Sequence, residues 1–239
     1  MNKNLSSVKA LTFDVFGTVV DWRSSVIKEL NELAEVKGIS ADWDSFADKW
    51  RGGYAPSMDK VRKGELTWKN IDELHRMVLD RLLDEFNIIG LSEQEKVHLN
   101  KAWHRLAPWP DSVKGLTKLK QKYIIATLSN GNISLLTNMA KHSGLPWDVI
   151  LSSELAKHYK NDSEVYLKAL SLLDLEPSEL MMCAAHQDDL IAAKALGFKT
   201  AYISRPLEFG PDESNDATDD MPFDIIANDI LDLALQLGA

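Results

Sequence analysis

The sequence predicts an α/β fold in which a parallel, Rossmann-like sheet carries a helical insert after its first strand. A mostly apolar run at residues 8–13 indicates a strand, and the next comparable run comes only at residues 123–128. Apolar residues between the two runs recur at the spacing of amphipathic helices. Beyond Pro110, short apolar runs alternate with helical segments, which is typical of a parallel sheet with helices on both faces.

The insert is predicted to be all-helical. Its apolar positions follow the period of a helix, at Val26, Leu30, Leu33 and Ala34, then at Ile71, Leu74, Val78 and Leu82, and later at Val97 and Leu106. Pro108 and Pro110 end this pattern, because proline stops helices. We therefore expect an α/β core formed by residues 1–22 and 108–239, and a helical domain formed by residues 23–107.

Strands and helices alternate in the second half of the chain. Further strands are predicted at residues 149–151, 180–184 and 200–203, and helices at residues 165–173 and 190–196. A short helical turn starts at Pro177, and Gly197 ends the second helix. The acidic stretch 208–220 contains Gly and Pro and is predicted to be a loop. A last helix is expected from about Asp229, with Asn228 as its cap.

The composition is that of a globular protein with a sizeable core, since 45% of the 239 residues are hydrophobic and 26% are charged. The net charge of -9 argues against a nucleic-acid partner, because phosphate binding needs a basic surface. The single cysteine, Cys183, lies in an apolar run and is predicted to be a buried, unreactive thiol. Residues 1–7 lack the apolar segment of a signal peptide and no stretch is long enough for a membrane span, so we expect a cytoplasmic protein without a membrane partner.

Polar side chains follow four of the predicted strands. Binding sites of open parallel sheets form beyond the carboxyl ends of the strands, so these side chains are expected to share one crevice. In chain order they are Asp14 and Thr18, then Ser129 and Asn130, then Lys160, then His186 with Asp188 and Asp189. Each one alone is an ordinary turn former, helix cap or solvated side chain. Together they place carboxylates, hydroxyls, an amide, an ammonium and an imidazole at one edge of the sheet.

These segments resemble the four sequence motifs of the haloacid dehalogenase superfamily. The similarity lies in residues 13–18, residues 129–131, Lys160 and Asp189. It extends over nearly the whole chain, because the superfamily also has a cap domain at the position of the insert. The resemblance implies a Rossmann-like hydrolase core in which Asp14 is a covalent nucleophile.

Two positions separate the chain from the phosphatases of that superfamily. The phosphatases have a second aspartate two residues after the nucleophile, which protonates the leaving oxygen, and this chain has Phe16 there. They also hold Mg²⁺ with an acidic residue of the fourth motif, where this chain has Ala185. Mg²⁺ needs oxygen ligands, and a halide leaves without being protonated. The resemblance therefore implies a metal-independent dehalogenase that uses no cofactor.

The L-2-haloacid dehalogenase branch is similar to this chain at Arg51, Lys160 and Tyr166. In that branch the equivalent arginine helps to receive the departing halide. The chain departs from the branch at Asn161, where proline is usual, and at His186, where the better-known enzymes have Asn. It resembles a variant subgroup with an Ala-Ala-His fourth motif, and the usual account of water positioning does not carry over to it.

The resemblance implies hydrolysis in two steps. Asp14 attacks C2 of a small (S)-2-haloacid, expels the halide and forms an aspartyl ester, and water then releases an (R)-2-hydroxyacid. Lys160 keeps Asp14 ionised through its opposite charge. The other expected roles are halide binding by Arg51 and Asn130, binding of the substrate carboxylate by Ser129 and the backbone N–H groups of Val15 and Phe16, and organisation of the site by Thr18 and Tyr166, the latter also counted among the substrate-binding residues.

A base is needed to activate the water. His186 is the expected base, because a neutral imidazole titrates near neutral pH. Asp21 and Asp189 are the carboxylates available to orient it, and we predict an Asp21–His186 pair, with Asp189 supporting Lys160. The alternative is that Asp21 caps the first helix of the insert and that His186 only packs.

Two other functions stay open at this point. One is a Mg²⁺-dependent phosphatase or phosphonate hydrolase of the same superfamily, and the other is a binding protein without catalytic activity. The aromatic residues of the insert, among them Trp50, Tyr54 and Trp68, either line the pocket or pack the insert onto the core. The partners expected are a small anionic 2-haloacid and water, and an apolar insert helix could supply the contact of a homodimer.

Overall fold

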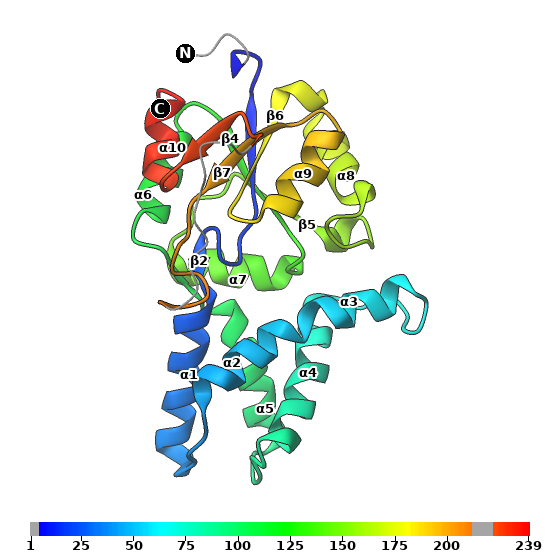
Figure 1. Ribbon diagram of the computed structural model, residues 1–239, viewed down its shortest axis with the longest axis vertical. Helices are drawn as coiled ribbons and strands as arrows, with labels where there is room; N and C mark the ends of the chain where they lie inside the picture. The colour runs from blue at the N-terminus through cyan, green and yellow to red at the C-terminus, as the bar shows by residue number, and fades with distance from the viewer. Residues whose placement is uncertain (1–4, 212–221) are drawn as a thin grey trace.

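Six parallel strands form the central sheet of the computed structural model, which describes residues 5–211 and 222–239 (Figure 1). In spatial order they are β5 (Val149–Ser152), β4 (Ile124–Ser129), β1 (Ala10–Phe13), β6 (Leu180–Ala184), β7 (Lys199–Ile203) and β8 (Ile225–Ala227). Parallel pairing of every neighbour brings the carboxyl ends of these strands to one edge of the sheet. The predicted α/β fold with a parallel sheet is confirmed.

Helices cover both faces of the sheet. One face carries α6 (Ser112–Leu119), α7 (Ile133–Ser143) and α10 (Ile230–Gln236), and the other carries α8 (Ser163–Leu173) and α9 (Gln187–Ala195). Successive side chains of a strand point to opposite faces, so the strands need apolar residues at every position. In β1, Leu11 and Phe13 belong to the first layer of the core and Ala10 to the second.

The chain leaves the sheet after β1 and forms a group of helices before it returns to the core (Figure 1). Their bounds are α1 (Trp22–Lys37), α2 (Trp43–Gly52), α3 (Tyr54–Arg62), α4 (Ile71–Glu85), α5 (Glu93–Asn100) and the 3-10 helix η2 (Lys101–His104). The short strands β2 (Val20–Asp21) and β3 (Ala107–Pro108) pair antiparallel where the chain enters and leaves this group. The helical insert after the first strand is therefore confirmed, and the division into domains at residues 23 and 107 remains a prediction.

Local sequence signals set the ends of the insert helices. Asn70 and Ser92 each form a capping box with the glutamate three residues on, at the starts of α4 and α5. Such a cap contributes about 1 kcal/mol, because it satisfies N–H groups that have no partner inside the helix. Two corrections concern the C-terminal part. Asp229, not Asn228, caps α10 by accepting from Asp232 N at 2.7 Å, and β8 was not predicted from the sequence.

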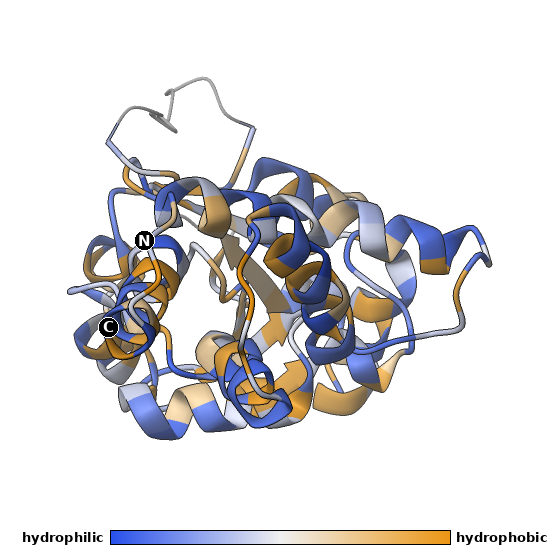
Figure 2. Cartoon of the chain, turned by 90° about the horizontal axis from the view of Figure 1, so that it is seen from below, coloured by the Kyte–Doolittle hydropathy of each residue, from blue (hydrophilic) through white to orange (hydrophobic). Residues whose placement is uncertain are grey.

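The insert and the sheet share one continuous hydrophobic core. Trp103 links them, since its ring meets Phe16 after β1 and also stacks on Trp22 at the start of α1. Trp50 is fully buried and donates its Nε1–H to the backbone of His75, so it packs the insert and does not line a pocket. Figure 2 shows the resulting pattern, with hydrophobic residues on the inner sides of the helices and hydrophilic residues outside. No helix within the described ranges is long and apolar enough to cross a membrane.

Candidate active site

A cavity of about 230 Å³ lies at the carboxyl ends of the strands, between the sheet and α3. Its lining combines residues that follow four strands with residues of the insert: Asp14, Phe16, Arg51, Tyr54, Ala55, Met58, Ser129, Asn130, Lys160, Asn161, His186, Asp188 and Asp189. The structure thus brings the predicted strand-end side chains together in one place. Tyr54, Ala55 and Met58 line the cavity from α3. The sequence left open whether Tyr54 lines the pocket or packs the insert, and it did not single out Ala55 or Met58.

Asp14 is the centre of the hydrogen-bond network in this cavity. It comes directly after β1, and its backbone N–H donates to Cys183, which fixes it at the edge of the sheet. Lys160 Nζ donates to Oδ1 at 2.8 Å, while Thr18 Oγ1 and His186 Nδ1 lie 2.9 Å and 3.1 Å from Oδ2. Burial alone would raise the pKa of Asp14, but Lys160 and then His186 outweigh burial and hold this pKa well below its usual range. The carboxylate is therefore ionised.

Lys160 is held between two carboxylates. Its Nζ lies 2.8 Å from Asp14 Oδ1 and 2.5 Å from Asp189 Oδ2. Burial would lower the pKa of Lys160, but the charges of Asp14 and Asp189 raise it above its ordinary value. Tyr166 donates to Asp189 Oδ1 at 2.6 Å and is fully buried outside the cavity lining. The hydroxyl of Tyr166 therefore holds Asp189, and the expectation that Tyr166 binds substrate stays a prediction.

Thr18 occupies the place predicted for it. Its hydroxyl donates to Asp14 Oδ2 at 2.9 Å and accepts from the backbone N–H of Ala185 at 2.9 Å. The side chain of Val15 is buried outside the cavity, and Phe16 lines it. Binding of a substrate carboxylate by the N–H groups of Val15 and Phe16 stays a prediction.

His186 faces a carboxylate on each side. Nδ1 lies 3.1 Å from Asp14 Oδ2, and Nε2 lies 2.9 Å and 3.1 Å from the two oxygens of Glu208. An ionised carboxylate only accepts hydrogen bonds, so this arrangement favours hydrogen on both ring nitrogens, as in an imidazolium. Burial would lower the pKa of His186, but the hydrogen bonds to Asp14 and Glu208 outweigh burial and raise it to about 10. The arrangement therefore favours a protonated ring over the neutral imidazole expected from the sequence, and the role of His186 as the base stays a prediction.

The predicted Asp21–His186 pair is also wrong. Asp21 accepts from Ser24 N at 3.0 Å and caps α1, which is the alternative that the sequence left open. Glu208 is the carboxylate that meets His186, and it was missed because it lies in a stretch predicted only as an acidic loop. The signal that could have found it is the rule applied to the other strands, because Glu208 follows the end of β7.

Arg51 and two polar residues after β4 complete the cavity. The Arg51 guanidinium lies 4.7 Å from the centre of the Tyr54 ring, and its buried Nε has no hydrogen-bond partner among the described residues. Asn130 Oδ1 accepts from the backbone N–H of Lys160 at 2.7 Å, and Ser129 Oγ accepts from the N–H of Gly131 at 3.2 Å. A half-buried guanidinium whose buried Nε–H has no partner among the described residues favours an anionic ligand.

The side chains do not fit a magnesium site. Phe16 and Ala185 supply no oxygen at the positions where the phosphatases of the superfamily have acidic residues. The ammonium of Lys160 lies between Asp14 and Asp189, where it would repel a cation. In residues 5–211 and 222–239, no group of three or more His, Cys, Asp or Glu side chains has the arrangement of a metal site.

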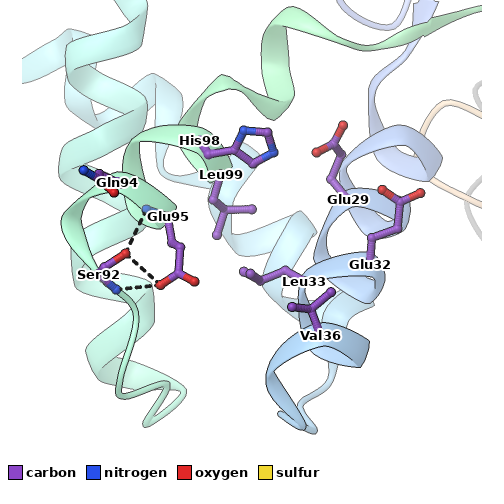
Figure 3. A pocket seen from close by; sticks show the side chains of 9 residues that line it. All are labelled: Glu29, Glu32, Leu33, Val36, Ser92, Gln94, Glu95, His98 and Leu99. Atoms are coloured by element: carbon purple, nitrogen blue, oxygen red, sulfur yellow. Dashed lines mark hydrogen bonds between the residues drawn. The ribbon is translucent and has the colours of Figure 1, made fainter.

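A larger cavity, of about 440 Å³, lies in the insert between α1 and α5, away from the strand ends (Figure 3). Its charged groups already have partners. Glu29 pairs with Arg105, and Glu95 pairs with Lys37 and caps α5 through Ser92. It therefore offers no unpaired acid or base comparable to the cavity around Asp14.

Comparison with known proteins agrees with this site. A family model described as haloacid dehalogenase-like hydrolase matches residues 8–197. The (S)-2-haloacid dehalogenase 4A of Burkholderia cepacia is 31% identical over 207 residues, which are 84% of this chain and 85% of the relative. The crystal structure of the L-2-haloacid dehalogenase PA0810 is 48% identical, with 97% of this chain and 99% of that chain covered and a TM-score of 0.93.

A second solved structure, of the defluorinating L-2-haloacid dehalogenase Rha0230, is 47% identical, with 97% of this chain and 96% of that chain covered and a TM-score of 0.93. Both structures extend over the sheet and the insert alike, since nearly all of each chain is matched. The chain belongs to the haloacid dehalogenase-like hydrolases and, within them, to the family of the L-2-haloacid dehalogenases.

Proposed function

We propose that the protein is an (S)-2-haloacid dehalogenase, which hydrolyses small (S)-2-haloacids to (R)-2-hydroxyacids through an ester on Asp14. The observation that carries the proposal is an ionised Asp14, paired with two cationic side chains, in a cavity that also contains Arg51. The cavity volume of about 230 Å³ is below the usual range for drug-sized ligands, which suits a haloacid of a few carbon atoms.

In the first step a carboxylate oxygen of Asp14 attacks C2 in line, the carbon–halogen bond breaks, and the halide departs with its electron pair. Within the described part of the chain, Oδ2 has two hydrogen-bond donors and Oδ1 has one. Oδ1 therefore keeps the freer lone pair, and we assign the attack to it. Because attack at carbon occurs once, the configuration at C2 inverts.

The second step is attack of water on the ester carbonyl, which frees Asp14 and releases the hydroxyacid. Arg51 and Asn130 receive the halide, and Ser129 with the backbone after Asp14 holds the substrate carboxylate. These roles are supported by the presence of the three side chains in one cavity lining. Asp189 holds Lys160 next to the nucleophile by accepting a hydrogen bond from its Nζ, and Tyr166 holds Asp189 in turn.

The test is a single turnover with 2-chloropropionate in ¹⁸O-water, with enzyme in excess. Asp14 supplies the oxygen of the first product, so this product should carry no label, while halide appears in solution. Label in the first product would contradict the ester.

Further assays test the substrate and the alternative functions. Halide release from chloroacetate and from fluoroacetate, measured under the same conditions, ranks the leaving halides. Activity that survives EDTA would separate this function from a Mg²⁺-dependent phosphatase, and a complete lack of halide release would favour a binding protein.

We further propose that the protein acts in the cytoplasm and forms a homodimer through its insert. The buried Cys183 thiol and the absence of disulfides among the described residues suit a reducing compartment.

The dimer contact is proposed at the cavity between α1 and α5. Val36 on α1 is 81% exposed there beside Leu33 and Leu99, and these residues supply an apolar contact surface. Sedimentation of the wild type and of Val36→Lys tests the dimer, since only the wild type should associate.

A further inference from the structure

Glu208 is a carboxylate around which the structure has built a closed site. Its side chain is fully buried, and Trp22 Nε1 donates to Oε1 at 3.3 Å. Gly17 leaves the room for it, because a Cβ at that position would lie 2.0 Å from Glu208 Oε1. Burying a carboxylate is costly unless it is paired, and the pairing partner here is the His186 ring.

The His186 ring connects Glu208 to the nucleophile, because each of its two nitrogens lies within hydrogen-bond distance of one of the two carboxylates. With Glu208 on Nε2, the ring directs its other N–H, on Nδ1, to Asp14 Oδ2. Thr18 Oγ1 donates to the same oxygen. Because Oγ1 also accepts from the backbone N–H of Ala185, the hydroxyl hydrogen is directed to Oδ2. Two donors from two different elements therefore converge on Oδ2, at 2.9 Å and 3.1 Å.

If Oδ1 becomes the ester oxygen, Oδ2 is the carbonyl oxygen of the ester. Negative charge then develops on Oδ2 when water attacks the carbonyl carbon. Donors that are already aimed at such an oxygen stabilise the transition state without reorganisation, and loss of one typically costs about 10²–10³ in rate.

We propose that Glu208 is a positioning residue that holds His186 protonated against Asp14 Oδ2, so that His186 and Thr18 form the oxyanion hole for hydrolysis of the aspartyl ester. This inference rests on the proposed function, because it concerns the second step of that reaction. It assigns His186 the role of a hydrogen-bond donor in place of the water-activating base that the sequence suggests.

The step balances without any further reactant. The water oxygen bonds to Cγ of Asp14, the bond from Cγ to Oδ1 of the ester breaks, and Oδ1 leaves as the hydroxyl oxygen of the product. One proton of the water goes to that departing oxygen. The other is released to solvent, since Asp14 returns to its ionised form. His186 and Thr18 keep their protons throughout.

Glu208 matters most after the ester has formed. Asp14 then has no charge, so Glu208 is the carboxylate still bonded to the ring. The other charged groups that share the cavity of His186 are Lys160, Arg51, Asp188 and Asp189, and its helix also carries Lys194 in the last turn. Lys160 and Arg51 oppose a proton on the ring, Asp188 and Asp189 favour one, and Glu208 is the carboxylate in hydrogen-bond contact with it. We therefore expect the protonated state in the ester to depend mainly on Glu208.

The experiment compares the wild type with Glu208→Gln, in which the glutamine can still accept from Nε2 but carries no charge. Halide release and hydroxyacid formation are followed separately in single turnovers between about pH 6 and 9. Wild-type ester hydrolysis should slow as the pH rises toward 9, because the donor loses its proton. In Glu208→Gln we expect halide release within about threefold of wild type and ester hydrolysis at least about tenfold slower at pH 8, with recovery toward pH 6.

Glu164→Gln, an exposed charge removal on α8, serves as the matched control and should behave as wild type. Ester hydrolysis that speeds up with pH would make His186 a neutral base and overturn the inference. An unchanged pH profile in Glu208→Gln would do the same for Glu208. The absence of any ester on Asp14 in the wild type would instead overturn the proposed function, together with this inference.

A second measurement does not depend on turnover. Asp14→Asn replaces the carboxylate with a neutral group of the same shape, as esterification does. The His186 ring is titrated by NMR in Asp14→Asn and in the double variant that adds Glu208→Gln. We expect the pKa of His186 to stay above the ordinary value of 6.5 in the first and to fall by at least about one unit in the second. Equal pKa values in the two variants would overturn the role of Glu208.

Discussion

The two oxygens of Asp14 lie in environments that differ in burial and in origin. On the Oδ1 side, Lys160, Asp189 and Tyr166 form a chain of charge and hydrogen bonds whose side chains are almost completely buried. On the Oδ2 side, the His186 side chain is 22% exposed and its partner Glu208 comes from an irregular segment. The first side keeps a nucleophile ionised, and the second side supplies donors to an oxygen that gains charge later. The difference suggests that each side serves one half of the reaction.

The largest effect on activity is expected from Lys160→Met, which removes the ion pairs of Lys160 with Asp14 and Asp189 on the Oδ1 side. Without the ammonium, Asp14 and Asp189 share one buried site with no cation between them, so one of them takes up a proton. The pKa of Asp14 rises, and activity should fall as the pH falls through this new value. We expect halide release to slow about 10²–10³-fold near neutral pH, measured as the halide burst.

Lys141→Met, an exposed charge removal on α7, is the control for this change. Ester hydrolysis, measured on whatever ester is formed, should be much less affected than halide release. If Lys160→Met slowed both steps equally, the assignment of Oδ1 to the first half of the reaction would be wrong.

A smaller effect is expected from Tyr166→Phe. This change removes one hydrogen bond to Asp189 and leaves the Lys160 ion pairs in place. A single buried hydrogen bond of this kind contributes about 1–2 kcal/mol, so halide release should slow about tenfold. Michaelis–Menten analysis provides the check, because kcat should fall while KM stays near wild type. A change confined to KM would instead indicate that Tyr166 binds substrate, as the sequence analysis expects.

The same contrast explains what the sequence could and could not predict. Asp14, Lys160 and Asp189 follow strands or begin helices, so an apolar run and the strand-end rule locate them. Glu208 lies five residues beyond β7 in a segment without periodicity, and the strand-end rule was not applied to β7, whose end carries no other site residue. Asp21 has the type and position of a helix cap and also of a histidine partner, and only the fold decides between the two.

The cavity lining from the insert shows the same limit. Tyr54 and Trp50 are both aromatic residues of the insert, and the sequence left open for both whether they line the pocket or pack the insert onto the core. The turn at Gly53 between α2 and α3 directs Tyr54 to the cavity, whereas Trp50 packs against Trp103. That choice depends on how α2 and α3 meet the sheet, which no local pattern in the sequence specifies.

The smallest effect is on stability, and it tests whether His186 is held protonated in the resting enzyme. The folded-state pKa of about 10 lies above the ordinary value of 6.5, so the stabilisation is complete below pH 6.5 and is lost as the pH rises toward 10. Asp14 behaves in the opposite sense, because its lowered pKa gives a contribution that is lost only below about pH 3.8. Between pH 6.5 and 10 the wild type should therefore lose on the order of 1–3 kcal/mol of unfolding free energy relative to His186→Gln, measured by urea denaturation. Taking the difference between the two proteins cancels the titration of groups they share. A difference that stays constant over this range would mean that the ring is neutral at rest, and the contrast between the two sides of Asp14 would then lie in burial alone.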